Sequence, residues 1–123
     1  MGFRTPGKLP ADMSSIPSFA LEVVKTGRST RIAPSGELDI ASAPEFEQAI
    51  ADATAEPGAG LVLDLRGLTF MDSTGLRALA QTNARADEAG FALSIYRGPR
   101  QIERVLEISG LADLLPLVDA PPA

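Results

Sequence analysis

Two aspartates and one serine are the residues whose type and spacing could do chemistry in this chain. Asp72 and Ser73 stand side by side within residues 68–76 (LTFMDSTGL), and Asp39 closes the earlier segment 36–39 (GELD). Carboxylates act as general acids and bases, and a serine hydroxyl acts as a nucleophile beside a base or accepts a phosphoryl group. These residues therefore suggest either an enzyme site or a modification site.

The composition argues against an enzyme. The 123 residues contain no His and no Cys, which excludes a Ser-His-Asp triad, a Cys-His pair, thiolate metal sites and disulfides built from this chain. Glycine-rich nucleotide-binding loops are absent too. The Asp-Ser-Thr-Gly order is similar to that of aspartic proteases, but it differs by one residue and has no second copy. We expect no catalysis, no cofactor and no metal site.

Charge and hydropathy limit the other function classes. The net charge of −5 argues against nucleic acid, which is bound mainly through clustered Lys and Arg. The arginines of the second half alternate with acidic residues and so predict a solvated surface. No apolar run approaches the roughly 20 residues that span a bilayer, and the N-terminus lacks a signal-peptide core. We expect a cytoplasmic protein that does not insert into membranes.

Hydrophobic periodicity predicts one α/β domain over residues 18–119, between a flexible tail over 1–17 and a frayed end over 120–123. Strands are expected at 19–24, 30–35, 61–65 and 91–96, with a short edge strand within 114–118. Helices are expected between Ser42 and Pro57, over 74–89 and between Pro99 and Gly110.

The order of these elements, ββαβαβα with an optional last strand, predicts a mixed sheet of four to five strands. Right-handed crossovers between neighbouring strands place all the helices on one face. Pro34 cannot donate a ladder hydrogen bond and is placed at a strand end, and residues 36–39 are expected to form a loop. Ser42 and Glu45 have the spacing of a capping box.

This topology brings Asp39, Asp72 and Ser73 to one edge of the sheet if the second and third strands are parallel neighbours. That edge is where open α/β sheets bind ligands. Ser73 would lie at a helix N-terminus, among free backbone N–H groups and the positive end of the helix dipole. We predict an exposed hydroxyl whose phosphorylation changes what this surface binds.

Four segments in order resemble a known family. Residues 36–39, 61–65 (LVLDL), 68–76 and 105–111 (VLEISGL) resemble STAS-domain anti-sigma factor antagonists. The resemblance runs from about Phe19 to Val118, so it implies the STAS fold for the whole predicted domain. A lone Asp-Ser-Thr-Gly would be weak evidence, whereas the four segments together are specific. The N-terminal tail and Pro34 depart from the family pattern.

The resemblance implies a partner switch in bacterial transcription, of the kind used in stress response and sporulation. The unphosphorylated antagonist binds an anti-sigma factor that is also an ATP-dependent serine kinase, and sigma factor is released. The kinase then phosphorylates the serine after the motif aspartate, here Ser73, and the complex dissociates. A metal-dependent phosphatase restores the active form. Asp39 matches the family's loop aspartate beside that serine.

The resemblance therefore implies a set of partner-binding residues around the phosphorylation site Ser73. The set is Asp39, Asp72, Ser73, Thr74, Gly75, Leu76 and Arg77. We expect Asp39 to shape the interface and Asp72 to orient the turn. Phe70 and Met71 are expected in the core.

Other interpretations of the same residues stay open. Ser73 could be no more than a helix cap, because Asp, Ser and Thr are the preferred N-cap residues. Asp39 and Asp72 could serve turns and caps alone, or form the acid/base pair of a hydrolase. The same fold could also be a regulatory or partner module of a membrane transporter, although such modules often lack a phosphorylatable serine after the motif aspartate.

Overall fold

The computed structural model describes residues 18–122, so the predicted tail over 1–17 lies outside the described residues. The strands are β1 (Phe19–Thr26), β2 (Ser29–Leu38), β3 (Gly60–Asp64), β4 (Gly67–Met71), β5 (Ala92–Tyr96) and β6 (Leu117–Val118). The helices are α1 (Ala43–Ala53), α2 (Ser73–Ala89) and α3 (Arg100–Ser109), with a short 3-10 helix, η2 (Leu111–Asp113). None of the helices in this part of the chain is both long enough and apolar enough to cross a bilayer.

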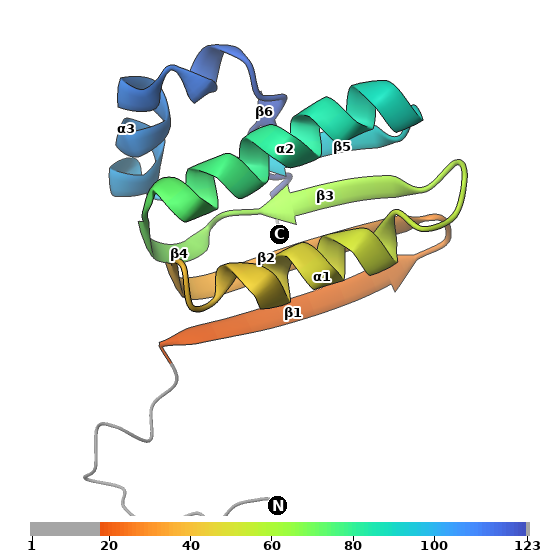
Figure 1. Cartoon of the computed structure of the whole chain (residues 1–123), viewed down its shortest axis with the longest axis horizontal. Helices are drawn as coiled ribbons and strands as arrows, with labels where there is room; N and C mark the ends of the chain where they lie inside the picture. Colours follow the sequence, from red (N-terminus) through yellow and green to blue (C-terminus); the bar gives the residue numbers. More distant parts are fainter. Residues whose placement is uncertain (1–17, 123) are drawn as a thin grey trace, which may run out of the picture.

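A mixed six-stranded sheet forms one layer and the helices form the other (Figure 1). The strand order is β1-β2-β3-β5-β6, with β4 paired to β2, and only the β1–β2 pair is antiparallel. Helices α1 and α2 lie side by side over the sheet, while α3 packs against β4 at one end. The predicted mixed α/β architecture is confirmed.

Strand β4 was not predicted as a separate strand. The chain leaves β3 at Asp64, turns through residues 65–66 and forms β4 alongside the last part of β2. The turn is closed by the N–H of Leu68, which donates to the carbonyl of Leu65 at 3.1 Å. Two short strands thus occupy consecutive parts of one side of β2, and the sheet has six strands instead of four to five.

Pro34 lies inside β2, not at its end as expected, at the point where β2 changes neighbours. Ile32 is the last residue paired with β3 and Ser35 is the first paired with β4. The carbonyl of Arg28 accepts from the N–H of Gly60 on the β3 side, and strand alternation turns the backbone of Pro34 to that side too. Its missing N–H therefore removes no ladder bond.

Two expectations about the segment between β2 and α1 are wrong. Residues 36–38 belong to β2, because all three pair with β4 and Gly36 also pairs with β1, and the chain bends there at Gly36 with φ 86°. The capping box of Ser42 and Glu45 does not form. The Ser42 hydroxyl instead donates to the carbonyl of Glu37 at 2.8 Å and accepts from the N–H of Asp39 at 2.9 Å.

One hydrophobic core lies between the helices and the sheet. The strands contribute side chains from alternate positions to this core, and each helix contributes the apolar side chains of the stripe that faces the sheet. Its fully buried side chains include Ile32, Leu61, Leu63 and Ile95 from the sheet, Phe46 and Ile50 from α1, Leu79 from α2, and Ile102 and Leu106 from α3. The helix ends match expectation, with Gly90 and Gly110 at left-handed C-caps.

A buried carboxylate stabilises the face of the sheet that the helices leave open. Asp64 is 3% exposed and accepts from the Arg66 backbone and side chain and from Arg31 at 2.8–3.1 Å. The hydrogen bond from the Arg66 side chain is the main reason that the pKa of Asp64 lies below its ordinary value of 3.8. This network connects the end of β3 to Arg31 of β2 and to Arg66 in the turn into β4.

Asp64→Asn should lower the free energy of unfolding at neutral pH by about 2 kcal/mol, because it weakens several charge-assisted hydrogen bonds. A carboxyl group with a lowered folded-state pKa contributes stability above its unfolded value and loses it as the pH falls through the folded value. Urea unfolding of both proteins should therefore show a difference at pH 7 that shrinks below pH 3.8.

Glu22→Gln is the matched control, since the Glu22 side chain is 64% exposed where it meets Arg31. An exposed ion pair of this kind contributes about 0–1 kcal/mol. An undiminished effect of Asp64→Asn at about pH 2.5 would show that the charge of Asp64 is not what stabilises the fold.

Candidate functional site

The segments that follow β2 and β4 begin side by side at one edge of the sheet. Leu38 pairs with Met71 at the ends of these parallel strands. One residue further on, the N–H of Asp72 donates to the carbonyl of Leu38 at 3.2 Å. The next residue after Leu38 is Asp39, so the structure brings Asp39, Asp72 and Ser73 to the same edge, as predicted.

Asp72 is the N-cap of α2 and leaves Ser73 free of that role. Its Oδ1 accepts from the N–H of Thr74 at 2.9 Å and from the N–H of Gly75 at 3.2 Å. Ser73 is the first helical residue, its side chain is exposed, and its hydroxyl makes no hydrogen bond to another residue of the described part. The alternative that Ser73 is the helix cap is therefore wrong.

Asp39 organises the loop between β2 and α1. Its Oδ1 accepts from the N–H groups of Ala41 and Ser42 at 3.0 and 3.1 Å and lies 3.2 Å from the Ser42 hydroxyl. The carboxylates of Asp39 and Asp72 are thus both engaged with backbone N–H groups of their own loops. Neither is hydrogen-bonded to Ser73 within residues 18–122.

Gly75 allows α2 to start close to the two strand ends. A Cβ at this position would lie 2.6 Å from the Met71 Cγ and 3.1 Å from the Leu38 Cγ. Gly75 is itself buried, so its predicted part in partner binding is limited to permitting this approach. Leu76 is half-buried against the core, and Arg77 is exposed and forms no salt bridge with other described residues.

Comparison with known proteins assigns the family. Residues 21–118 match the family model described as "Mlab, STAS domain". The chain belongs to the STAS domain family. This match spans β1 to β6 and thus includes the edge that carries Asp39, Asp72 and Ser73.

The relatives of this STAS domain include proteins named for one regulatory role. This chain is 28% identical over 95 residues to the anti-sigma-B factor antagonist of Bacillus subtilis (strain 168). The aligned region covers 77% of this chain and 86% of that protein. An anti-sigma factor antagonist from Mycobacterium paratuberculosis has a similar structure, with a TM-score of 0.70, 31% identity and coverage of 84% and 87% of the two chains.

The anti-sigma factor antagonist SpoIIAA has the same fold. Its unphosphorylated form superimposes with a TM-score of 0.71 at 20% identity, covering 83% of this chain and 89% of that one. Its phosphorylated form gives a TM-score of 0.66. The same order of strands and helices thus accommodates both states of that protein.

Two apolar side chains at the edge of this STAS domain were not predicted there. Ile40, directly after the loop aspartate, is 77% exposed, and Phe70 is 48% exposed although it was expected in the core. The reason for Phe70 is a register shift between β2 and β4, where Glu37 pairs with Phe70 while Gly36 pairs with Leu68. The extra residue, Thr69, turns two successive side chains outward. Met71 is 4% exposed, as expected.

The signal for Ile40 was present in the sequence. It stands between Asp39 and Ala41, outside both the strand expected at 30–35 and the helix expected to begin near Ser42. An isolated large apolar residue beside a polar loop is a candidate contact residue. The candidate site of this STAS domain therefore combines two loop carboxylates, two exposed apolar side chains, and a hydroxyl and a guanidinium that bind no other side chain within residues 18–122.

Asp72→Ala should lower the free energy of unfolding by about 1 kcal/mol, because α2 loses its N-cap. Asp72→Ser should retain most of the stability, since a serine oxygen accepts the same backbone hydrogen bonds. Urea unfolding followed by circular dichroism measures both. If the two variants were equally destabilised, the acceptor role assigned to Asp72 would be wrong.

Proposed function

We propose that this STAS domain is an anti-sigma factor antagonist controlled at Ser73. Its unphosphorylated form binds an anti-sigma factor serine/threonine kinase and frees sigma factor, and phosphorylation of Ser73 abolishes binding. The observation that carries the proposal is the exposed Ser73 hydroxyl in the first turn of α2, with the cap supplied by Asp72. The names of the relatives support the same role.

The docking surface is the sheet edge and first turn of α2, formed by Asp39 and residues 72–77. Ile40 and Phe70 flank it and provide the apolar area that a stable interface needs at its centre. Arg77 is exposed and free to bind an acidic group of the kinase. Gly75 contributes by letting α2 approach Leu38 and Met71.

A phosphoryl group on Ser73 would change the charge of the docking surface. It adds about −1.5 to −2 charges at one point. The N–H groups of Thr74 and Gly75, which would otherwise bind an anion at a helix N-terminus, already donate to Asp72. The new charge therefore lies beside the carboxylate of Asp72 and faces a partner surface fitted to a neutral hydroxyl. Each 1.4 kcal/mol of such mismatch weakens binding about tenfold.

The cycle requires two enzymes and no chemistry from this chain. The kinase partner supplies ATP-dependent phosphorylation, and a metal-dependent serine phosphatase removes the phosphate from Ser73. The STAS domain is the substrate of both, acting in the cytoplasm without nucleic acid, membrane insertion or a cofactor. A role as a transporter module is the alternative, and the free hydroxyl after the motif aspartate favours the antagonist.

Ser73→Ala should bind the kinase partner as tightly as the wild-type chain does. In the presence of ATP its complex should last longer than that of the wild-type chain, because the variant cannot be phosphorylated. Ser73→Asp should bind at least about tenfold more weakly, because it places a carboxylate at the docking surface. Isothermal titration with candidate anti-sigma kinases measures both. Mass spectrometry after incubation with kinase and ATP should locate phosphate at Ser73. Equal binding of the two variants would refute the switch.

Ile40→Ser should weaken kinase binding by about tenfold or more, because a large aliphatic side chain buried on docking contributes about 1.5–3 kcal/mol. Ile108→Ser is a matched control, since Ile108 is 76% exposed against 77% for Ile40 but lies at the far end of α3. The control should bind normally. Equal effects of the two substitutions would remove Ile40 from the docking surface.

A further inference from the structure

The outer edge of β1 pairs with no other strand of residues 18–122 and carries exposed aliphatic side chains. Within the described part of the chain β1 pairs only with β2, and it is the first strand in the sheet order. Val23 is 52% exposed and Val24 is 40% exposed. An eight-residue edge strand with apolar side chains, and with Glu22 and Lys25 as its only charges, is a template for pairing with another strand.

The backbone groups that face outward can be assigned from the pairing with β2. The carbonyl of Ser18 accepts from the N–H of Glu37 at 2.8 Å, so even-numbered residues of this segment face β2. Alternation then directs the N–H and C=O groups of Phe19, Leu21, Val23 and Lys25 to the open edge. A second strand can pair only through these odd-numbered residues.

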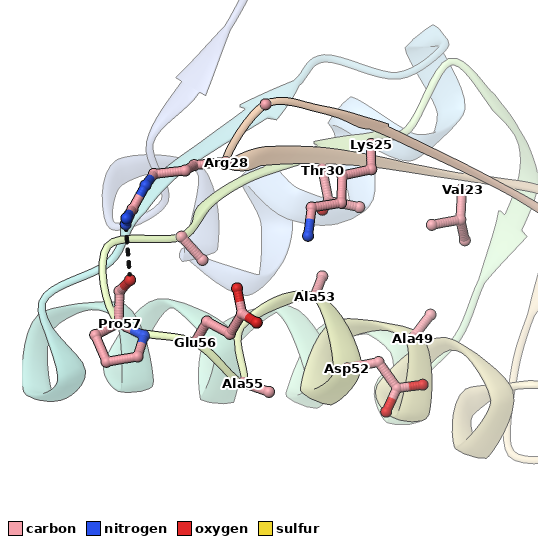
Figure 2. A pocket seen from close by; sticks show the side chains of 12 residues that line it. Val23, Lys25, Arg28, Thr30, Ala49, Asp52, Ala53, Ala55, Glu56 and Pro57 are labelled. Carbon is pink, nitrogen blue, oxygen red and sulfur yellow. Dashed lines mark hydrogen bonds between the residues drawn. The ribbon is translucent and has the colours of Figure 1, made fainter.

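A cavity of about 390 Å³ lies beside this edge, between β1 and α1 (Figure 2). Val23 and Lys25 line it from the strand, and Ala49, Asp52 and Ala53 line it from the helix. Figure 2 shows the Lys25 side chain extending from the strand toward the helix side of the cavity. Lys25 forms no salt bridge with another described residue, so its charge is available to a partner.

We propose that β1 pairs antiparallel with β1 of a second copy of this chain, about a two-fold axis that passes through Val24 perpendicular to the sheet. The two sheets then form one continuous twelve-stranded sheet, twice the six strands of one copy, with the helices of both copies on the same side. The contact is closed, because each copy presents the same strand to the other.

The charges along β1 select this register. An axis at Glu22 or at Lys25 would place that residue opposite its own copy, and like charges directly opposite each other are destabilising. An axis at Val24 places Val24 opposite Val24 and Lys25 opposite Val23 of the other copy. Val23 shares the cavity with Asp52, so each Lys25 would extend toward Asp52 of the other copy.

An axis at Val23 also avoids placing a charge opposite its own copy, but it matches these charges less well. It would place Lys25 opposite Leu21, which is outside the cavity lined by Asp52. The axis at Val24 also places Glu22 opposite Thr26, where it opposes no like charge. The position of Asp52 in the cavity lining therefore favours Val24 as the centre.

The proposed dimer leaves the Ser73 surface open. Val24 pairs with Arg31 near the hairpin, whereas the docking edge lies beyond Leu38, at the other end of β2. The proposal of self-association is therefore independent of the proposal of kinase binding, and a different experiment tests each of them.

Sedimentation velocity of the full chain over a range of concentrations should show a monomer–dimer equilibrium. Val24→Arg should weaken self-association by about tenfold or more, since two guanidinium groups would stand opposite each other across the axis. Val118→Arg is the matched control, because Val118 is 42% exposed on the last strand in the sheet order, β6, and should leave the equilibrium unchanged. A monomeric wild-type chain, or equal effects of the two substitutions, would overturn the proposal.

A single cysteine tests the register, because the chain has none of its own. Residues opposite each other in a non-hydrogen-bonded pair have Cα atoms about 4.5 Å apart, within the range of a disulfide. Val24→Cys should therefore yield a covalent dimer under mild oxidation. Val23→Cys is more exposed but lies about 7–8 Å from its own copy in this register and should not. Failure of Val24→Cys to crosslink, or equal crosslinking of Val23→Cys, would overturn the register.

Exchanging the charges of the proposed ion pair between Lys25 and Asp52 gives a further test. Lys25→Glu and Asp52→Lys should each weaken self-association, because each places like charges together at two symmetric positions. The double variant should restore it. No recovery in the double variant would show that Lys25 and Asp52 do not meet across the axis.

Discussion

The parallel pairing of β4 with the last part of β2 is the constraint on which the site depends. It ends both strands at the same level, where the carbonyl of Leu38 accepts from the N–H of Asp72. The loop aspartate and the first turn of α2 follow directly from these strand ends. Gly75 completes the arrangement, because any side chain there would collide with Met71. The position of Ser73 is therefore fixed by backbone pairing, and its own side chain is left free.

Asp72 binds backbone N–H groups at the N-terminus of α2, and this arrangement suits a modification site at Ser73. A phosphate at a helix N-terminus is normally stabilised by free N–H groups and by the helix dipole. Here the Asp72 carboxylate already occupies two of those N–H groups. The unmodified chain gains helix stability from the cap, and a phosphate on Ser73 would find these two N–H groups already hydrogen-bonded. One residue thus both stabilises the fold and makes added negative charge at the surface unfavourable.

Much of the fold and the edge could be predicted from the sequence because the signals are local. A strand followed by Asp-Ser-Thr-Gly and a helical pattern places Ser73 at a helix start, and Gly90 and Gly110 mark helix ends. Strand β4 could not be separated, because the two-residue turn at 65–66 lacks the Pro or Asn-Gly that usually marks a tight turn. Phe70 was misplaced for the same reason, since its exposure depends on a bulge in β4 that only the pairing with β2 defines.

The two proposed surfaces use the two kinds of unsatisfied group that an α/β sheet leaves at its borders. At the strand ends, helix N-termini and loop carboxylates present directional polar groups, which one added charge can disrupt. Along β1, the outward-facing backbone groups and the exposed Val24 favour pairing with a second strand through repeated backbone hydrogen bonds. A charge on Ser73 is too distant to affect this pairing. Because Val24 and Ser73 lie at opposite ends of β2, a dimer through β1 would present two docking edges pointing away from each other. With the proposed function, such a dimer would hold two kinase molecules, and phosphorylation of each Ser73 would release one of them.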